Sequence, residues 1–327
     1  MNILPATGGD PIGAAALLDH ANPVELERFA ALEDAVWGKT TLSPAVTEAV
    51  RLHCAQVRGC AFCSAVRITA AIEDGLSEAH IANLGTPGSR DWCSTEQTAA
   101  LTLVDHFLRD PQRPGDEQRS AISAALGTSG VMEVLLACCA FASADLRIAL
   151  GENLEPLGSG VFERARGERV LRTAGTTWPV LDGSVLDPAT TLPAVAAELA
   201  APIHERVTAL WSGADMTQEL VAACTVRSAQ LLGVNSEDPV SRFLIPSFAA
   251  GLADAEDVRG WPQWTAAQGR YELALGEQLW MDPAGVDESI TEPLLAARGT
   301  DGLIRIAWSL ILIGQLHRVA LVLHGGP

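Results

Sequence analysis

The sequence predicts an all-α protein made of two tandem helical units. Apolar residues recur at three- and four-residue spacing along most of the chain, whereas the period-two alternation of exposed strands is scarce. Hydrophobic residues make up 48% of the chain against 19% charged, so a sizeable core can be buried. Segments of the first half also recur in the second half at a nearly constant offset.

The helix around residues 44–58 is the most clearly delimited one. Val46, Val50 and Val57 lie on one helical face, Ser43-Pro44 is a typical N-cap and first-turn pair, and Gly59 interrupts the helix. The same spacing predicts the other helices, over residues 95–109, 117–126, 130–150, 216–232 and 302–323. The last of these carries charged residues within its apolar run, which predicts a buried core helix rather than a membrane span.

Internal repetition sets the predicted domain organisation. "WCSTEQTAALTLVDHFLRDP" (92–111) matches "WTAAQGRYELALGEQLWMDP" (264–283) without a gap, and "GTSGV" (127–131) matches "GTDGL" (299–303) at the same offset of 172 residues. "HCAQVRG" (53–59) matches "RSAQLLG" (227–233). We therefore predict a first unit over residues 1–155, a linker over 156–203 and a second unit over 204–327.

Charge and the N-terminus limit the classes of partner and location. The formal net charge of -18 disfavours nucleic acid and anionic membrane surfaces as partners. No basic segment precedes the first apolar residues, so we expect no export signal and a cytoplasmic location, and a single lysine among many arginines indicates a bacterium with GC-rich DNA. In a reducing cytosol, the close pair Cys60-x-x-Cys63 is expected to be redox-active or metal-binding.

The residues around this pair favour redox chemistry. Cys60 is expected in the first turn of a helix that restarts after Gly59, where free backbone N–H groups favour a thiolate. Residues 60, 63 and 67 would share one stripe within about 60° of helix surface, placing Arg67 beside the sulfurs. Glu48, on the preceding helix, is a candidate general base. Two buried core cysteines, or a zinc site with Cys54 or His53, are the alternatives.

Four stretches together resemble a known family. They are "E48-x11-C60-x-x-C63", "GLSEAHI", "STEQTAALTLVDHFL" and "ADLRIAL", and they are similar to the alkylhydroperoxidase-D and carboxymuconolactone decarboxylase family. The resemblance implies an all-helical, thiol-dependent peroxidase or disulfide reductase without a metal or cofactor. It implies that Cys63 attacks a hydroperoxide, Cys60 resolves the product, Glu48 is the base, and a dithiol protein restores the pair.

One position departs from the family. Arg67 stands where the family has a histidine, and arginine cannot relay a proton near neutral pH. His53 is a substitute candidate, although its apolar face favours a core histidine. In the second unit Ala222, Val234 and Glu237 occupy the positions of Glu48 and the two cysteines, so dithiol chemistry is expected in the first unit only.

The sequence is also compatible with other functions. A non-redox lyase or isomerase would act on a small organic acid held by Arg67, and a scaffold protein would carry a vestigial site. A homo-oligomer is expected by analogy with single-unit relatives. Cys138-Cys139 are expected to pack in the core. Asp145-Leu146-Arg147 and Leu316-His317-Arg318 end corresponding helices of the two copies, and each is expected to form an ion pair or helix C-cap that holds its own unit together.

Overall fold

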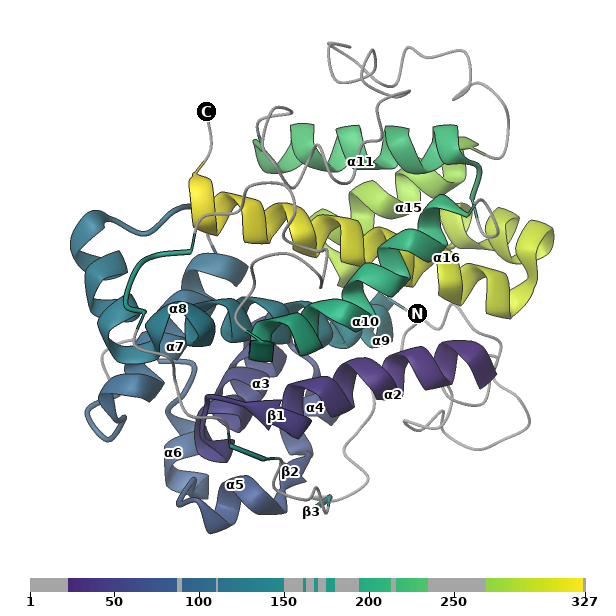
Figure 1. The fold of residues 1–327 in the computed structure, drawn as a ribbon. Coiled ribbons are helices and arrows are strands. Elements are labelled where there is room, and N and C mark those ends of the chain that lie inside the picture. The colour runs from purple at the N-terminus through teal and green to yellow at the C-terminus, as the bar shows by residue number, and fades with distance from the viewer. Residues whose placement is uncertain are drawn as a thin grey trace.

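The computed structural model describes residues 23–86, 90–109, 111–149, 161–162, 168–169, 175–179, 194–212, 216–234 and 269–325. Across these residues the protein is all-α, as predicted, and its strands are two residues long (Figure 1). The helices of the first half are α2 (Pro23–Gly38), α3 (Pro44–Arg58), α4 (Ala61–Ala65), α5 (Thr69–Glu73), α6 (Glu78–Ala82), α7 (Thr95–Leu108), α8 (Asp116–Ala140) and α9 (Ser143–Ala149).

The second half is described in part. Its helices are α10 (Ala194–Trp211), α11 (Gln218–Leu232), α15 (Gly269–Met281), the 3-10 helix η3 (Pro283–Gly285) and α16 (Glu288–His324). Two parallel strand pairs connect distant segments: β1 (Lys39–Thr40) pairs with β4 (Glu168–Arg169), and β2 (Arg67–Ile68) pairs with β3 (Val161–Phe162). Most of the predicted linker lies outside the described residues, and α10 spans the boundary predicted at residue 204.

Local sequence accounts for the ends of α3. The Ser43 side chain accepts a hydrogen bond from the Val46 N–H, and Pro44 occupies the first turn. Gly59 ends the helix in the left-handed conformation, with φ 76°, and its N–H and that of Cys60 bond to carbonyls of the last turn. The predicted start and end of this helix are thus confirmed.

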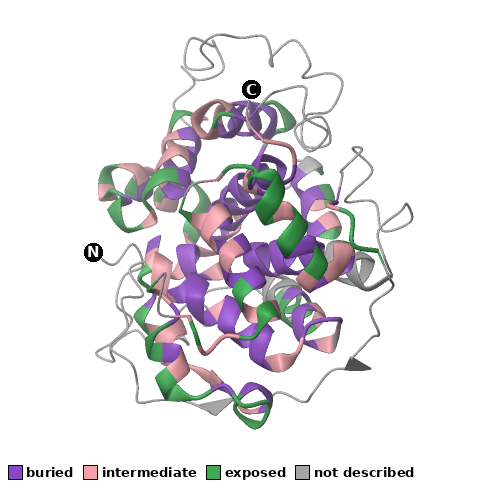
Figure 2. Ribbon diagram, turned by 90° about the vertical axis from the view of Figure 1, so that its left-hand side faces the viewer, coloured by how far each residue is buried: buried purple, intermediate pink, exposed green. Residues whose placement is uncertain are grey.

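The longest helices lie at the centre of the molecule. α8 packs on α7, α16 packs on α15, and α16 also contacts α7, α8 and α9 (Figure 1). The helical segments Asp116–Ala149 and Glu288–His324 are long and apolar enough to cross a membrane by composition, but 78% and 94% of their most apolar stretches are buried inside the protein. This burial, visible in Figure 2, agrees with a core role for residues 302–323.

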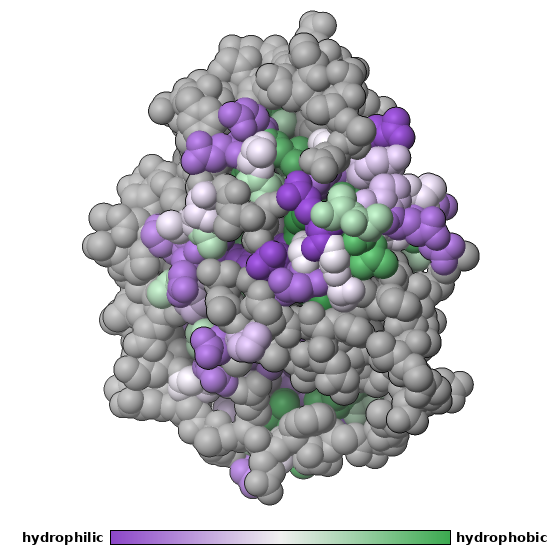
Figure 3. All heavy atoms as spheres, turned by 90° about the vertical axis from the view of Figure 1, so that its right-hand side faces the viewer, coloured by the Kyte–Doolittle hydropathy of each residue, from purple (hydrophilic) through white to green (hydrophobic). Residues whose placement is uncertain are grey.

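The described surface has few large apolar side chains. Ile72 and Met281 are the large hydrophobic residues that are exposed within the described ranges. On the face drawn in Figure 3, hydrophilic and apolar residues are interspersed.

Corresponding features recur in the two halves. α8 and α16 each contain one non-helical glycine, Gly127 with φ 67° and ψ 169° and Gly299 with φ 67° and ψ 176°. α3 and α11 both end at a left-handed glycine, Gly59 and Gly233. These glycines occupy matched positions in the sequence repeats, which supports the predicted duplication. The division into two units stays a prediction, because buried residues from both halves belong to one apolar cluster.

Candidate functional site

Cys60 and Cys63 lie next to each other in the turn between α3 and α4. They are joined as a disulfide, with their Cα atoms 5.4 Å apart, which is a usual separation for a bonded pair. Cys60 is the N-cap of α4, and its sulfur accepts a hydrogen bond from the Cys63 N–H at 3.2 Å. Cys60 is only 2% exposed, whereas Cys63 is half-buried. Cys63 is therefore the more accessible sulfur.

A small apolar cluster surrounds the pair. Cys60 packs with Ala55 and Ala144, and Phe62, Cys63 and Ile148 lie against them. The Arg147 guanidinium, from α9, lies over the Phe62 ring with its carbon 5.1 Å from the ring centroid. Helix α9 thus forms one wall of the dithiol site.

The predicted helical stripe from Cys60 to Arg67 is wrong. α4 ends at Ala65, and Val66 is extended with φ -72° and ψ 142°. Arg67 belongs to strand β2 instead. Because the backbone leaves the helix before residue 67, the side chain of Arg67 does not continue the helical face that carries the two cysteines.

Arg67 forms a surface ion pair. Its Nε and Nη2 donate to the two carboxylate oxygens of Glu78 at 2.7 and 2.9 Å. Its Nη1 donates to the carbonyls of Ser64 and Val66 at 2.5 and 2.9 Å. The hydrogen bond to Glu78 raises the pKa of Arg67 and lowers the pKa of Glu78. The described partner of Arg67 is thus Glu78 rather than Glu48 or a cysteine sulfur.

Glu48 is buried and forms an ion pair with Arg51, a residue that sequence reasoning missed. It is 1% exposed, and its Oε2 and Oε1 accept hydrogen bonds from Nε and Nη2 of Arg51, both at 2.7 Å. Arg51 also donates from Nη1 to the Cys63 carbonyl and from Nη2 to the Val66 carbonyl, both at 2.8 Å. Arg51 therefore connects Glu48 to the cysteine turn. The spacing Glu48-x-x-Arg51 was the available signal, because residues three apart are neighbours on a helix.

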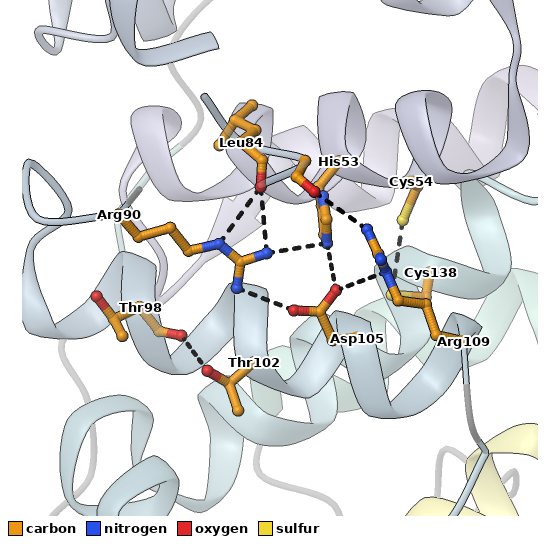
Figure 4. A network of polar contacts seen from close by, with 10 residues as sticks. His53, Cys54, Leu84, Arg90, Thr98, Thr102, Asp105, Arg109 and Cys138 are labelled. Atoms are coloured by element: carbon orange, nitrogen blue, oxygen red, sulfur yellow. Dashed lines mark hydrogen bonds and ion pairs between the residues drawn. The ribbon is translucent and has the colours of Figure 1, made fainter. Parts of the chain in front are cut away.

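His53 belongs to a different network, on the side of α3 that faces α7. It is completely buried, and its Nε2 lies 2.8 Å from Asp105 Oδ1 (Figure 4). Arg90 donates to Asp105 at 2.9 Å, and Arg109 lies 3.1 Å from the same carboxylate. Burial alone would raise the pKa of Asp105, but its contacts with His53 and Arg90 outweigh burial and lower it. These contacts are those of a core histidine, and none of them reaches Cys60 or Cys63.

Of the remaining thiols described in the first half, Cys54, Cys138 and Cys139 are buried, whereas Cys93 is half-buried. Cys54 and Cys138 lie with their sulfurs 3.9 Å apart, and Cys138 and Cys139 pack in the core as predicted. Burial raises the pKa of Cys139 to about 12. Cys54 and His53 thus contact Cys138 and Asp105, which argues against their serving as zinc ligands together with the Cys60/Cys63 pair.

A buried polar cluster lies directly behind the cysteine turn. Arg58 Nε is 2.8 Å from Asp145 Oδ1, and Gln315 of α16 bonds to both residues. Asp145 thus forms an ion pair, as predicted for its element, with Arg58 as the partner. Arg318 donates to backbone carbonyls of both halves, those of Phe107, Leu108 and Trp280.

The second half lacks the side chains of this site. Ala222 and Val234, at the positions of Glu48 and Cys60, are buried apolar residues. Glu237, at the position of Cys63, lies outside the described residues.

One comparison with known proteins matches the segment that carries this site. The model of the carboxymuconolactone decarboxylase family matches residues 23–104, which include α3, the cysteine turn and Arg67. No curated protein and no solved structure matches the chain. The matched segment, which holds Glu48, Cys60 and Cys63, is thus similar to the carboxymuconolactone decarboxylase family.

Proposed function

We propose that the protein is a thiol-dependent oxidoreductase whose Cys60 and Cys63 cycle between dithiol and disulfide. The observation that carries this proposal is the bonded cysteine pair within the family segment, with Cys60 buried and Cys63 half-buried. A buried sulfur beside an accessible one suits a resolving thiol beside an attacking thiol.

The reaction with a hydroperoxide balances with these two residues. The Cys63 thiolate attacks the terminal peroxide oxygen, the O–O bond breaks, and the alkoxide takes a proton and leaves as an alcohol. The Cys60 sulfur then attacks the Cys63 sulfenic acid, and hydroxide leaves as water when the disulfide forms. An external dithiol restores the pair by supplying two electrons and two protons.

Glu48 is proposed as the proton acceptor and Arg67 as electrostatic support. Both oxygens of Glu48 accept hydrogen bonds from Arg51, so taking a proton would cost at least one charge-assisted bond. Arg67 contributes positive charge at the end of α4, where helix carbonyls lack helical partners.

Thiol counting tests this proposal. The reduced wild type should lose two free thiols per chain when it is treated with an alkyl hydroperoxide. Cys63→Ser should lose none at the same concentration. A wild type whose thiol count does not change would refute the redox function.

A second candidate is acid–base chemistry on a small organic acid. It is favoured by the buried Glu48–Arg51 pair and by the decarboxylase in the name of the matched family. In that case a Cys60→Ser/Cys63→Ser variant would keep its turnover, whereas Glu48→Gln would lose it. Loss of activity in the double serine variant would exclude this candidate.

The setting of the site is part of the proposal. We propose a cytoplasmic bacterial protein, a dithiol protein as reductant, and assembly into a homo-oligomer. The second unit would serve as structural support, because Gln315 of α16 contacts Arg58, two residues before Cys60.

A further inference from the structure

We propose that Arg51 is the positioning residue of the dithiol site, and that the Glu48–Arg51 pair controls the charge that Cys63 experiences. The inference rests on the proposed function in taking Cys63 as the reacting thiol. It gives Arg51 a positioning role, in addition to the electrostatic support proposed for Arg67.

The hydrogen bonds of Arg51 hold the cysteine turn against Glu48. Its three guanidinium nitrogens make four hydrogen bonds of 2.7 to 2.8 Å, two to the Glu48 carboxylate and two to the carbonyls of Cys63 and Val66. Such a set needs a planar group with five N–H donors, which arginine alone provides. A lysine at this position would keep the charge and lose most of these bonds.

Helix α4 is too short to hold its own position. The helix has five residues, none of them buried, so little apolar packing holds it in place. Its last carbonyls have no helical partner, because the chain becomes extended at Val66. Arg51 donates the hydrogen bond to the Cys63 carbonyl that a further helical turn would otherwise supply. It therefore fixes the backbone of the residue that carries the accessible sulfur.

The two arginines at this helix end differ in the burial of their partners. The side chain of Arg67 is 13% exposed, but that of its partner Glu78 is 72% exposed, so solvent screens this pair. Arg51 is anchored to Glu48, and the side chains of this pair are 12% and 1% exposed. If one charge of the buried pair is removed, solvent screens the remaining charge poorly. The remaining charge would then act on the nearby Cys63 sulfur.

The two members of the pair should therefore have opposite effects on Cys63. With Glu48 neutralised, the unpaired guanidinium would stabilise the thiolate. With Arg51 neutralised, the unpaired buried carboxylate would oppose it. A purely structural role predicts effects of the same sign, because either substitution breaks the same hydrogen bonds.

The experiment is the pH profile of iodoacetamide alkylation at Cys63, located by mass spectrometry in the reduced full-length chain. We expect Glu48→Gln to move the inflection down by about one pH unit and Arg51→Gln to move it up by a similar amount. The double variant Glu48→Gln/Arg51→Gln should return close to the wild type. It leaves no buried unpaired charge, so it keeps the test open if Arg51→Gln does not fold.

Two controls complete the design. Arg51→Lys should keep the inflection near that of the wild type, while thermal unfolding occurs at a lower temperature. Arg227→Gln breaks a half-buried ion pair with Glu277 between α11 and α15, and it should leave the Cys63 profile unchanged.

The inference is overturned if the two single variants shift the profile in the same direction, or if the double variant keeps the full shift of Glu48→Gln. Because alkylation reads thiolate formation and not oxidation, this result is independent of hydroperoxide turnover. A wild type that does not oxidise would refute the proposed function, while the profiles would still decide the role of Arg51.

Discussion

The Arg58 guanidinium and the Asp145 carboxylate form a buried ion pair, with Nε 2.8 Å from Oδ1. Gln315 of α16 completes it, donating to Asp145 at 3.1 Å and accepting from Arg58 at 3.2 Å. The end of the cysteine-bearing helix α3 is thus held by a residue of the second half of the chain. We therefore expect the stability of the two halves to be interdependent.

Removal of the Gln315 side chain should lower the stability of the whole chain. Gln315→Leu leaves one hydrogen-bonding group unsatisfied on each member of a buried ion pair, which should cost about 1–3 kcal/mol in the free energy of unfolding. Urea denaturation measures it. Gln278→Ala, which removes a half-buried side chain bonded to the carbonyl of the exposed Asp282, is the control and should change stability by less than about 0.5 kcal/mol. Equal effects would contradict the proposed coupling.

The buried His317 should make the fold sensitive to acid. Desolvation lowers the pKa of His317 to about 3 in the folded protein, from its ordinary value of 6.5. Between these values the unfolded chain binds a proton that the folded chain does not, so stability falls as pH decreases. From pH 7.5 to pH 5 this amounts to about 2 kcal/mol. Urea denaturation should show that His317→Asn loses about 2 kcal/mol less unfolding free energy between pH 7.5 and pH 5 than the wild type does. This difference should hold whatever the variant's stability at pH 7.5.

The kinks of α8 and α16 should resist substitution to the same degree. Gly127 and Gly299 both combine φ 67° with an extended ψ, a region that residues with a Cβ rarely adopt. Gly127→Ala and Gly299→Ala should each cost about 1–3 kcal/mol in thermal or urea unfolding. Gly38→Ala, where an added Cβ meets no atom within 4 Å and φ is not positive, is the matched control. A neutral result at only one kink would count against structural equivalence of the two halves.

The cysteines should differ sharply in reactivity. In the reduced native protein, iodoacetamide should modify Cys63 first. Partial burial raises the pKa of the half-buried Cys93, and burial raises the pKa of the buried Cys138, Cys139 and Cys224. These three should react only after denaturation. Peptide mapping at increasing times measures the order, and labelling of the core cysteines at the rate of Cys63 would refute the packing described here.

The surface pair at the end of α4 should matter little for stability. Glu78→Gln removes the exposed partner of Arg67, and exposed ion pairs contribute at most about 1 kcal/mol. We expect the free energy of unfolding to change by no more than that amount. The rate of hydroperoxide-dependent thiol loss should stay within about twofold of the wild type. A much larger loss of reactivity would mean that the orientation of Arg67 is essential for the reaction.

Local sequence determined the helices and the position of the cysteine pair. Ser43, Pro44 and Gly59 delimit α3 because capping and backbone preferences act over a few residues. The spacing of Cys60 and Cys63 brings the sulfurs together within one turn, and the pairing of Glu48 with Arg51 was also readable as an i, i+3 pair.

Tertiary structure decided what surrounds those sulfurs. Arg67 left the helical face because residues 67 and 68 pair with residues 161 and 162, a contact far along the chain. The contacts of Arg58 with Asp145 and Gln315, and of His53 with Asp105, likewise join residues that are far apart in the sequence. A sequence pattern reports neighbours on one helix, whereas ion pairs between helices depend on how whole elements pack, so these partners appear only in the folded chain.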